Sequence, residues 1–178
     1  MPTERTVATE RIYDGRVVAL ERRNVTMADG RRVQREVVLH APVVAIVPVD
    51  EHGRVLLVRQ WRTPVERELL EVPAGGVDGG ESPEEAVQRE LQEEVGVRAG
   101  EVVRLAGLWV APGYCTEHIT VYLARDLAPS RLEGDEDEAI VVVPLPLADA
   151  LAAVASGEIC DAKSVIGLVL AAQRLGAG

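Results

Sequence analysis

A glycine-rich loop that runs into a glutamate-rich segment constrains the fold of this chain more than any other stretch. Residues 75–97 read GGVDGGESPEEAVQRELQEEVGV. Ser82 is a favourable N-cap, Pro83 suits the first helical position because its missing N–H has no partner there, and Glu85 completes a capping box. Gly96 suits the position just beyond the last helical turn. The sequence therefore predicts a helix that begins after Ser82 and ends near Gly96.

The sides of this predicted helix differ in character. Apolar side chains recur every four residues and form a stripe that can pack on a sheet, namely Val87, Leu91 and Val95. Glu90, Glu93 and Glu94 share another side, where like charges repel one another. A divalent cation would cancel this repulsion, and hard oxygen ligands favour Mg²⁺ or Mn²⁺. The alternative is a solvated acidic face without a ligand.

The spacing of the fixed positions favours the metal site. Between Gly75 and Val97 the pattern is G-x5-E-x7-R-E-L-x-E-E-x-G-V, which resembles the Nudix box at every defining position. The resemblance implies that the metal-binding carboxylates are those of Glu90, Glu93 and Glu94. It also implies that Glu93 is a catalytic residue. It further implies that Arg89 orients these carboxylates as part of the catalytic group, and that Glu81 supports the site or shares a further metal.

The same resemblance implies an architecture. The expected fold class is α/β, a Nudix-type α/β/α sandwich with a mixed central sheet and an N-terminal β-hairpin region. Residues 1–40 would form the hairpin arm and residues 41–178 the Nudix hydrolase domain, both parts of one unit. A homodimer is expected, and members of the family hydrolyse a nucleoside diphosphate linked to another moiety.

Composition excludes several other classes of protein. The 178 residues suit one domain, and because aromatic residues make up only 3% with no Phe, the core must be built from Val, Leu, Ile and Ala. A formal net charge of −10 argues against a nucleic-acid partner. The sequence has neither an apolar run long enough for a membrane nor a signal peptide, so we expect a cytoplasmic protein. Cys115 and Cys160 are interpreted as ordinary thiols.

The N-terminal region is predicted to form strands over residues 17–27 and 31–40, joined by an Asp-Gly turn. Its many charges are typical of a solvated edge hairpin. The alternative comes from the ADP-ribose pyrophosphatase branch of the family, which the sequence REVVLH at residues 35–40 resembles. In that branch the arm crosses to a partner subunit and helps to hold the adenine, which implies that Arg35, Glu36 and, upstream, Arg16 bind substrate.

Two apolar runs, residues 43–49 and 54–60, are predicted to form a hairpin at the centre of the sheet. Arg62 follows the second run, and it either lies along the sheet edge or, as the similar V-R-Q-x-R sequence of the family implies, binds the diphosphate through its planar fork. Residues 70–75, LEVPAG, resemble the segment before the box in the ADP-ribose branch. The backbone carbonyl of Ala74 is thereby implied as a metal ligand.

A strand predicted over residues 102–110 ends at APGYCTEH. Pro112 lies 15 residues beyond Val97, where a proline marks the ADP-ribose branch, and Glu117 matches the acidic residue of that branch near the terminal ribose or a second metal. A turn carboxylate is the alternative for Glu117. Tyr114 leaves another substrate open, because the dinucleoside-polyphosphate hydrolases of the family place a tyrosine about there.

The C-terminal third is predicted to contain strands over residues 119–124 and 141–145 and helices over residues 147–155 and from Asp161 to about residue 175. Between the strands lies the acidic run EGDEDEAI at residues 133–140. Such a run is typical of a solvated loop, but it is also similar to the catalytic loop of the ADP-ribose branch. Glu136 and Glu138 are the two candidates for the glutamate that activates water.

These observations predict a metal-dependent hydrolase of a small nucleotide conjugate. ADP-ribose, giving AMP and ribose 5-phosphate with two or three Mg²⁺ or Mn²⁺ ions per site, is the expected substrate. One alternative is a pyrophosphatase of a nucleotide sugar such as GDP-mannose or UDP-glucose. The other is a module that senses ADP-ribose without turnover, which the intact box disfavours.

Overall fold

The structure is a computed structural model that describes residues 3–134 and 139–176. The chain divides into two compact units, each of which is discontinuous in sequence. The first comprises residues 1–42 and 108–118, and the second comprises residues 43–107 and 119–178. Each unit has a sheet system of its own.

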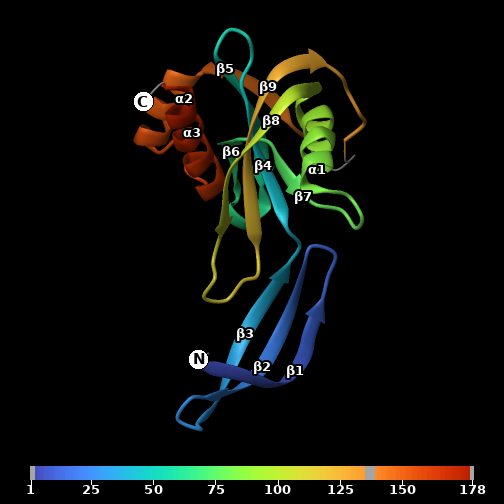
Figure 1. The fold of residues 1–178 in the computed structure, drawn as a ribbon, viewed down its shortest axis with the longest axis vertical. Helices are drawn as coiled ribbons and strands as arrows, with labels where there is room; N and C mark the ends of the chain where they lie inside the picture. Colours follow the sequence, from blue (N-terminus) through green and yellow to red (C-terminus); the bar gives the residue numbers. More distant parts are fainter. Residues whose placement is uncertain (1–2, 135–138, 177–178) are drawn as a thin grey trace. The chain divides into compact units, whose positions relative to one another are not determined.

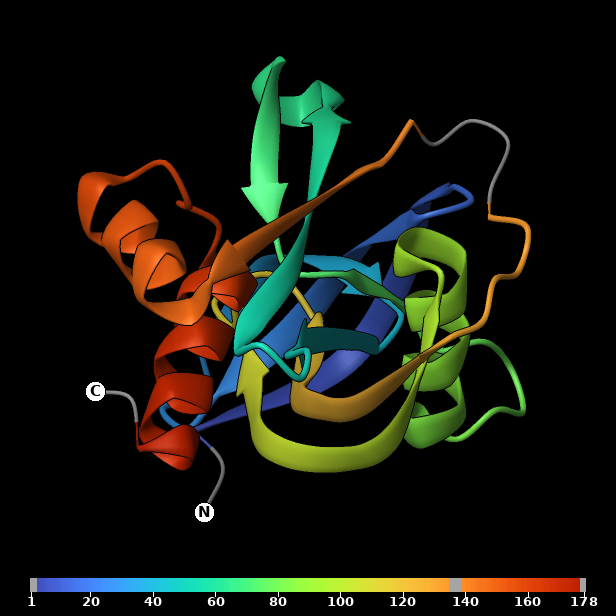
Figure 2. The ribbon, with the colours of Figure 1, turned by 90° about the horizontal axis from the view of Figure 1, so that it is seen from above.

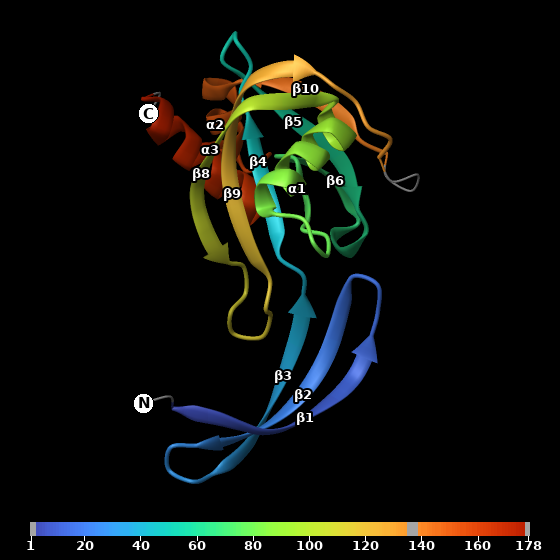
Figure 3. The same ribbon diagram turned by 45° about the vertical axis from the view of Figure 1, so that its right-hand side comes forward.

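The first unit contains a three-stranded antiparallel sheet (Figure 3). Its strands, in the order β1-β2-β3, are β1 (Glu4–Asp14), β2 (Val18–Met27) and β3 (Arg32–His40). The predicted pair of strands and their turn are confirmed, and Gly30 adopts the left-handed conformation (φ 85°) that the turn requires. The sequence did not predict β1, whose side chains are almost all exposed.

Residues 108–118 join this unit through backbone bonds to β3. The N–H of Val38 donates to the carbonyl of Tyr114 (2.8 Å), and the N–H of Thr116 donates back to the carbonyl of Val38 (2.9 Å). The hydroxyl of Thr116 accepts a further bond from the N–H of His40 (3.0 Å). The segment is therefore an ordered extension of the sheet edge.

The second unit has two sheets. The four-stranded sheet has the order β7-β4-β9-β8, formed by β7 (Ala74–Gly76), β4 (Val43–Pro48), β9 (His118–Pro129) and β8 (Val97–Trp109). Because β4 runs antiparallel to β7 and parallel to β9, this sheet is mixed, as predicted. The three-stranded sheet has the order β10-β5-β6, formed by β10 (Val141–Pro146), β5 (Arg54–Arg62) and β6 (Arg67–Glu71), with a 3₁₀ turn (Thr63–Val65) between the last two.

The prediction that residues 43–49 and 54–60 form one central hairpin is wrong. The turn itself is as expected, since Gly53 has a φ of 73° and the Asp50 carboxylate accepts from the N–H groups of His52 and Arg54. Beyond it, however, β4 and β5 enter different sheets. They share one isolated bridge, between Val49 and Val55. Each strand forms longer pairings with other strands, and those long-range pairings override the local hairpin signal.

Helices cover both sides of the mixed sheet in this unit (Figures 1 and 2). On one side lies α1 (Pro83–Glu90), which continues as a π-helical turn (Leu91–Val95). On the other side lie α2 (Leu147–Ser156) and α3 (Ala162–Leu175), whose predicted ends are confirmed. The unit is thus an α/β/α sandwich. Among the described residues, no helix combines the length and apolar character needed to cross a membrane.

The central strand β4 is buried along its whole length, and its alternating side chains pack on the two helical layers. Val44 and Ile46 belong to a core cluster with Val87 and Leu91 from the glutamate-rich helix. On the opposite face, a side chain at Gly167 of α3 would come within 3.1 Å of Val47. Aliphatic side chains dominate this core, as the composition predicts, and they hold α1 firmly on the sheet.

Candidate active site

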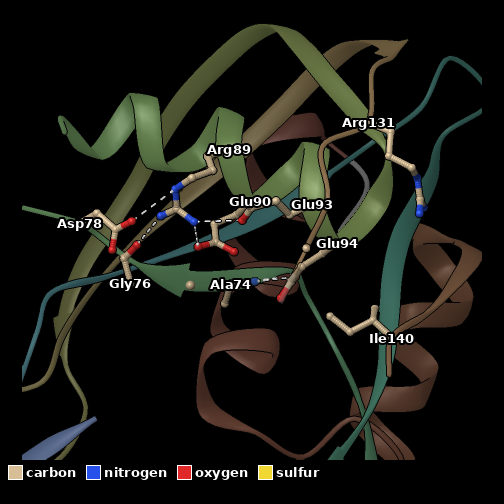
Figure 4. A pocket seen from close by; sticks show the side chains of 11 residues that line it. Ala74, Gly76, Asp78, Arg89, Glu90, Glu93, Glu94, Arg131 and Ile140 are labelled. Atoms are coloured by element: carbon tan, nitrogen blue, oxygen red, sulfur yellow. Dashed lines mark hydrogen bonds and ion pairs between the residues drawn. The ribbon is translucent and has the colours of Figure 1, made fainter. Parts of the chain in front are cut away.

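A cavity of about 480 Å³ lies where β7 faces the glutamate-rich helix in the second unit (Figure 4). Its lining comes from the strand, the loop after it, the helix, and the described residues Arg131, Gly134 and Ile140. The lining residues are Ala74, Gly75, Gly76, Asp78, Arg89, Glu90, Glu93, Glu94, Arg131, Gly134 and Ile140.

The helix beside the cavity begins and ends as its sequence dictates. The N–H of Glu85 donates to the Ser82 hydroxyl (3.3 Å), and the Glu85 carboxylate accepts from the N–H of Ser82 (2.7 Å), so the predicted capping box is confirmed. At the other end Gly96 is left-handed, with a φ of 77°. Its N–H bonds the carbonyl of Leu91, five residues back, which makes the last turn a π turn. The sequence did not predict this widening.

Arg89 is the centre of a dense set of hydrogen bonds (Figure 4). Its Nη1 donates to Glu90 (2.6 Å) and Glu93 (3.0 Å), and its Nη2 donates to Glu81 (2.7 Å) and the carbonyl of Gly76 (2.8 Å). Its Nε donates to the other oxygen of Glu81 (3.3 Å). An arginine has five N–H donors, so every one of them has an acceptor within the protein.

These contacts also shift the ionisation of the groups involved. The hydrogen bond to Glu81, followed by the charge of Glu90 and the hydrogen bonds to Glu90 and Glu93, raises the pKa of Arg89 despite partial burial. The same bond from Arg89 lowers the pKa of Glu81 below its usual value. The Arg89–Glu81 pair therefore stays ionised throughout the range near neutral pH.

The helix carboxylates are packed closely against β7. Glu90 and Glu94 are buried, with 7% and 8% of their surface exposed, and the carboxylate of Glu94 accepts from the N–H of Ala74 (3.1 Å). The Glu90 carboxylate lies directly over Gly75, where even a methyl group would overlap it. Glycine at position 75 therefore provides the space in which this carboxylate sits.

The charges of the lining fit a divalent cation. Four carboxylates and two guanidinium groups line the cavity, so negative charge exceeds positive by two. In residues 3–134 and 139–176, no three His, Cys, Asp or Glu side chains converge as a preassembled metal cluster, because the carboxylates turn toward Arg89 and the N–H of Ala74. Mg²⁺ commonly uses only one or two carboxylates and completes its octahedron with water and phosphate oxygens. The oxygen-rich lining is consistent with that mode of binding.

Most residues of the predicted metal site lie together. Ala74, Arg89, Glu90, Glu93 and Glu94 all line the cavity. Glu81 is absent from the lining, and its carboxylate instead bonds Arg89 and the N–H of Asp78 (2.7 Å).

Arg62 is engaged away from this lining. Its planar fork binds the buried carboxylate of Glu71 through two bonds, of 2.9 and 2.7 Å. Lys163 of α3 also donates to Glu71, so the carboxylate connects β5, β6 and α3. Burial alone would raise the pKa of Glu71, but the bonds from Arg62 and Lys163 hold this pKa below its usual value. A contact between Arg62 and a diphosphate stays a prediction.

The other predicted substrate residues belong to the first unit, namely Arg16, Arg35, Glu36, Pro112 and Glu117. Arg35 donates to Glu4 (2.6 Å), and Glu36 pairs with Arg22 in the register of β2 and β3. Their roles stay predictions. The two candidates for the catalytic base, Glu136 and Glu138, lie outside the described residues.

Several lining residues were not predicted, namely Asp78, Arg131, Gly134 and Ile140. Asp78 follows the glycines of the loop. Its closeness to Glu81 in the sequence could have indicated that it belongs to the site. Arg131 precedes the acidic run and Ile140 is its last residue, and no local pattern distinguishes the two from ordinary loop residues. The fold alone brings them to the cavity.

Comparison with known proteins gives consistent results. A family model described as the NUDIX domain matches residues 39–163. The ADP-ribose pyrophosphatase of Bacillus subtilis (strain 168) is 38% identical over 163 residues, covering 90% of this chain and 88% of that protein. The ADP-ribose pyrophosphatase of Mycobacterium tuberculosis (strain ATCC 25618 / H37Rv) is 39% identical over 167 residues, covering 92% and 81%. A crystal structure of an ADP compounds hydrolase superposes with a TM-score of 0.89 at 29% identity, covering 100% of this chain and 98% of the other.

Proposed function

Because this chain belongs to the Nudix hydrolase family, we propose that it hydrolyses the diphosphate of ADP-ribose, with water, to AMP and ribose 5-phosphate. The carboxylate-lined cavity between β7 and the glutamate-rich helix carries this proposal. The choice of ADP-ribose is supported by the two ADP-ribose pyrophosphatases at 38% and 39% identity.

Two or three Mg²⁺ or Mn²⁺ ions would be held by the carbonyl of Ala74 and the carboxylates of Glu90, Glu93 and Glu94. Such ions, when bound, polarise phosphoryl oxygens and lower the pKa of a water molecule. The carboxylate of Glu81 already accepts three hydrogen bonds, two from Arg89 and one from the N–H of Asp78. Its contacts favour a supporting role.

The protein's own residues would then position and activate the reactants. Arg89 holds Glu90 and Glu93 in place, and it has no N–H left to bind substrate. Glu136 or Glu138 would take the proton from the attacking water. Arg89 is therefore a positioning residue, and the proton is transferred to a glutamate of the acidic run.

The remaining substrate contacts are proposed from the sequence. Arg16, Arg35 and Glu36 would hold the adenine from the partner subunit of a homodimer, Arg62 would approach the diphosphate, and Pro112 and Glu117 would lie near the terminal ribose. The enzyme would act in the cytoplasm.

A substrate panel tests the proposal. ADP-ribose, GDP-mannose, UDP-glucose, NADH and diadenosine polyphosphates are each incubated with Mg²⁺, with Mn²⁺ or with a chelator, and released phosphomonoester is measured. We expect ADP-ribose to have the highest kcat/KM and the chelator to abolish turnover. Faster hydrolysis of GDP-mannose or UDP-glucose would replace the proposal with a nucleotide-sugar pyrophosphatase. Binding of ADP-ribose without hydrolysis of any compound would indicate a sensor.

A further inference from the structure

We propose that Arg131 binds the diphosphate oxygens of the substrate, a role that no motif in the sequence indicates. The inference rests on the proposed function, since it concerns the ligand of the same cavity. Three features support this role: the hydrogen bonds that occupy Arg89, the backbone that positions Arg131, and the carboxylates of the cavity.

The first step is that Arg89 cannot serve as the phosphate ligand. Its five N–H donors are used by Glu81, Glu90, Glu93 and the carbonyl of Gly76. Redirecting one of them to a phosphate would break a hydrogen bond that Arg89 makes within the protein. The only other guanidinium among the described lining residues is that of Arg131.

Arg131 differs from Arg89 in its contacts. Within residues 3–134 and 139–176, the structure records neither a hydrogen bond nor an ion pair for its guanidinium. The group lies beside Gly96, where a Cβ atom would come within 3.1 Å of Nε and 3.3 Å of Nη2. Figure 4 shows it apart from the Arg89 cluster, in the part of the view that also contains Ile140.

The backbone on both sides of Arg131 is fixed to the end of the glutamate-rich helix. The N–H of Ser130 donates to the carbonyl of Gly96 (3.0 Å), and the N–H of Leu132 donates to the carbonyl of Gln92 (3.2 Å). In a regular α-helix the Gln92 carbonyl would accept from Gly96. Here the N–H of Gly96 bonds Leu91 instead, so the π turn leaves the Gln92 carbonyl available to Leu132.

The π turn therefore has a consequence for the cavity. It provides the acceptor for one of the two backbone bonds on either side of Arg131. These bonds keep Arg131 at the lining, next to the helix that carries the carboxylates. The backbone that carries Arg131 is thus fixed beside the cavity, and its guanidinium can bind a phosphate through its planar fork. Four carboxylates line the cavity, so a diphosphate that enters it is favoured by this guanidinium as well as by the metal ions.

Substitution of Arg131 tests the assignment. Arg131→Gln removes the charge, Arg131→Lys keeps it without the fork, and Arg125→Gln removes an exposed arginine of β9 that is absent from the cavity lining. Both backbone bonds of the neighbouring residues persist in every variant, so we expect unchanged thermal unfolding. The dissociation constant for ADP-ribose is measured by calorimetry in a Glu93→Gln background, with Mg²⁺ present, to prevent turnover. Steady-state kinetics are measured with Glu93 intact.

Arg131→Gln should raise the dissociation constant about 10- to 100-fold and lower kcat/KM at least as much, with Arg131→Lys intermediate and Arg125→Gln unchanged. An unchanged dissociation constant, with wild-type hydrolysis of ADP-ribose, would overturn the role of Arg131 and leave the proposed function standing. A lower kcat with an unchanged dissociation constant would also overturn it. If the wild type binds ADP-ribose without hydrolysing it and Arg131→Gln still weakens binding, the proposed function fails and the assignment of Arg131 stands.

Discussion

Gly75→Ala should separate activity from stability. The added methyl group would overlap the carboxylate of Glu90, which is the far end of a flexible side chain. Gly75 does not adopt a positive φ, so alanine fits its backbone. We therefore expect the fold to persist while the Glu90 carboxylate moves away from β7.

The expected magnitudes follow from the contacts that would be lost. Displacing Glu90 breaks its 2.6 Å bond to Arg89, and a hydrogen bond between charged groups contributes about 1.5–3 kcal/mol. Replacing glycine by alanine restores about 0.4–1 kcal/mol through the unfolded state. The net loss of about 0.5–2.6 kcal/mol corresponds to a Tm decrease of about 1–10 °C. We expect activity to fall about 100-fold, because misplacing a reacting group by about 1 Å has an effect of this size.

The assay compares three alanine variants by release of phosphomonoester from ADP-ribose and by thermal unfolding. At Gly76 and Gly79 an added methyl group meets nothing within 4 Å, and neither residue has a positive φ. Gly76→Ala, in the same strand, should unfold at or slightly above the wild-type Tm, because an unstrained replacement of glycine stabilises by about 0.4–1 kcal/mol. Gly79→Ala should do the same, and because Gly79 is absent from the cavity lining this variant should also keep wild-type activity. Wild-type kcat/KM in Gly75→Ala would refute the placement of Glu90, and complete unfolding would refute the expected flexibility of its side chain.

Three further changes have definite expectations. Glu94→Gln should lower kcat by at least about 100-fold with folding intact, because it removes a proposed metal ligand; near-wild-type turnover in saturating Mg²⁺ would exclude it from the mechanism. Glu71→Gln should cost about 3–5 kcal/mol at pH 7, because it leaves Arg62 and Lys163 without their buried partner. Since the pKa of Glu71 is lowered in the folded state, its contribution is present above pH 4.5 and is lost as the pH falls through the folded pKa. Urea unfolding between pH 7 and pH 3 should therefore show a steeper loss of stability in the wild type than in Glu71→Gln, and parallel curves would contradict the pairing. Ser82→Ala should cost about 0.5–2 kcal/mol in the same measurement, and no change would show that the capping box is dispensable.

Local signals in the sequence were sufficient to predict the helices whose ends are specified by capping residues. The capping box at Ser82, the glycine at position 96 and the N-cap at Asp161 each specify where a helix begins or ends, and the structure confirms all three. Such signals depend only on neighbours within a few residues. For the same reason the carboxylate face of the helix could be recognised before its partners were known.

Features that depend on distant partners could not be predicted in this way. Strand β1 has no buried face, so its sequence lacks the alternation that indicates a strand. The turn at Asp50 is a genuine hairpin signal, but long pairings in two different sheets separate β4 from β5. Arg131 is held at the cavity because its neighbours Ser130 and Leu132 make backbone bonds to Gly96 and Gln92, which no spacing in the sequence reveals.

The products formed from ADP-ribose provide the most direct test of the central claim. Phosphorus NMR of a reaction containing the wild-type protein, ADP-ribose and Mg²⁺ should show the diphosphate signals replaced by two phosphomonoesters in equal amounts, AMP and ribose 5-phosphate. A chelator should prevent this conversion. An unchanged diphosphate in saturating Mg²⁺ or Mn²⁺, or release of inorganic phosphate in place of the two monoesters, would contradict the account.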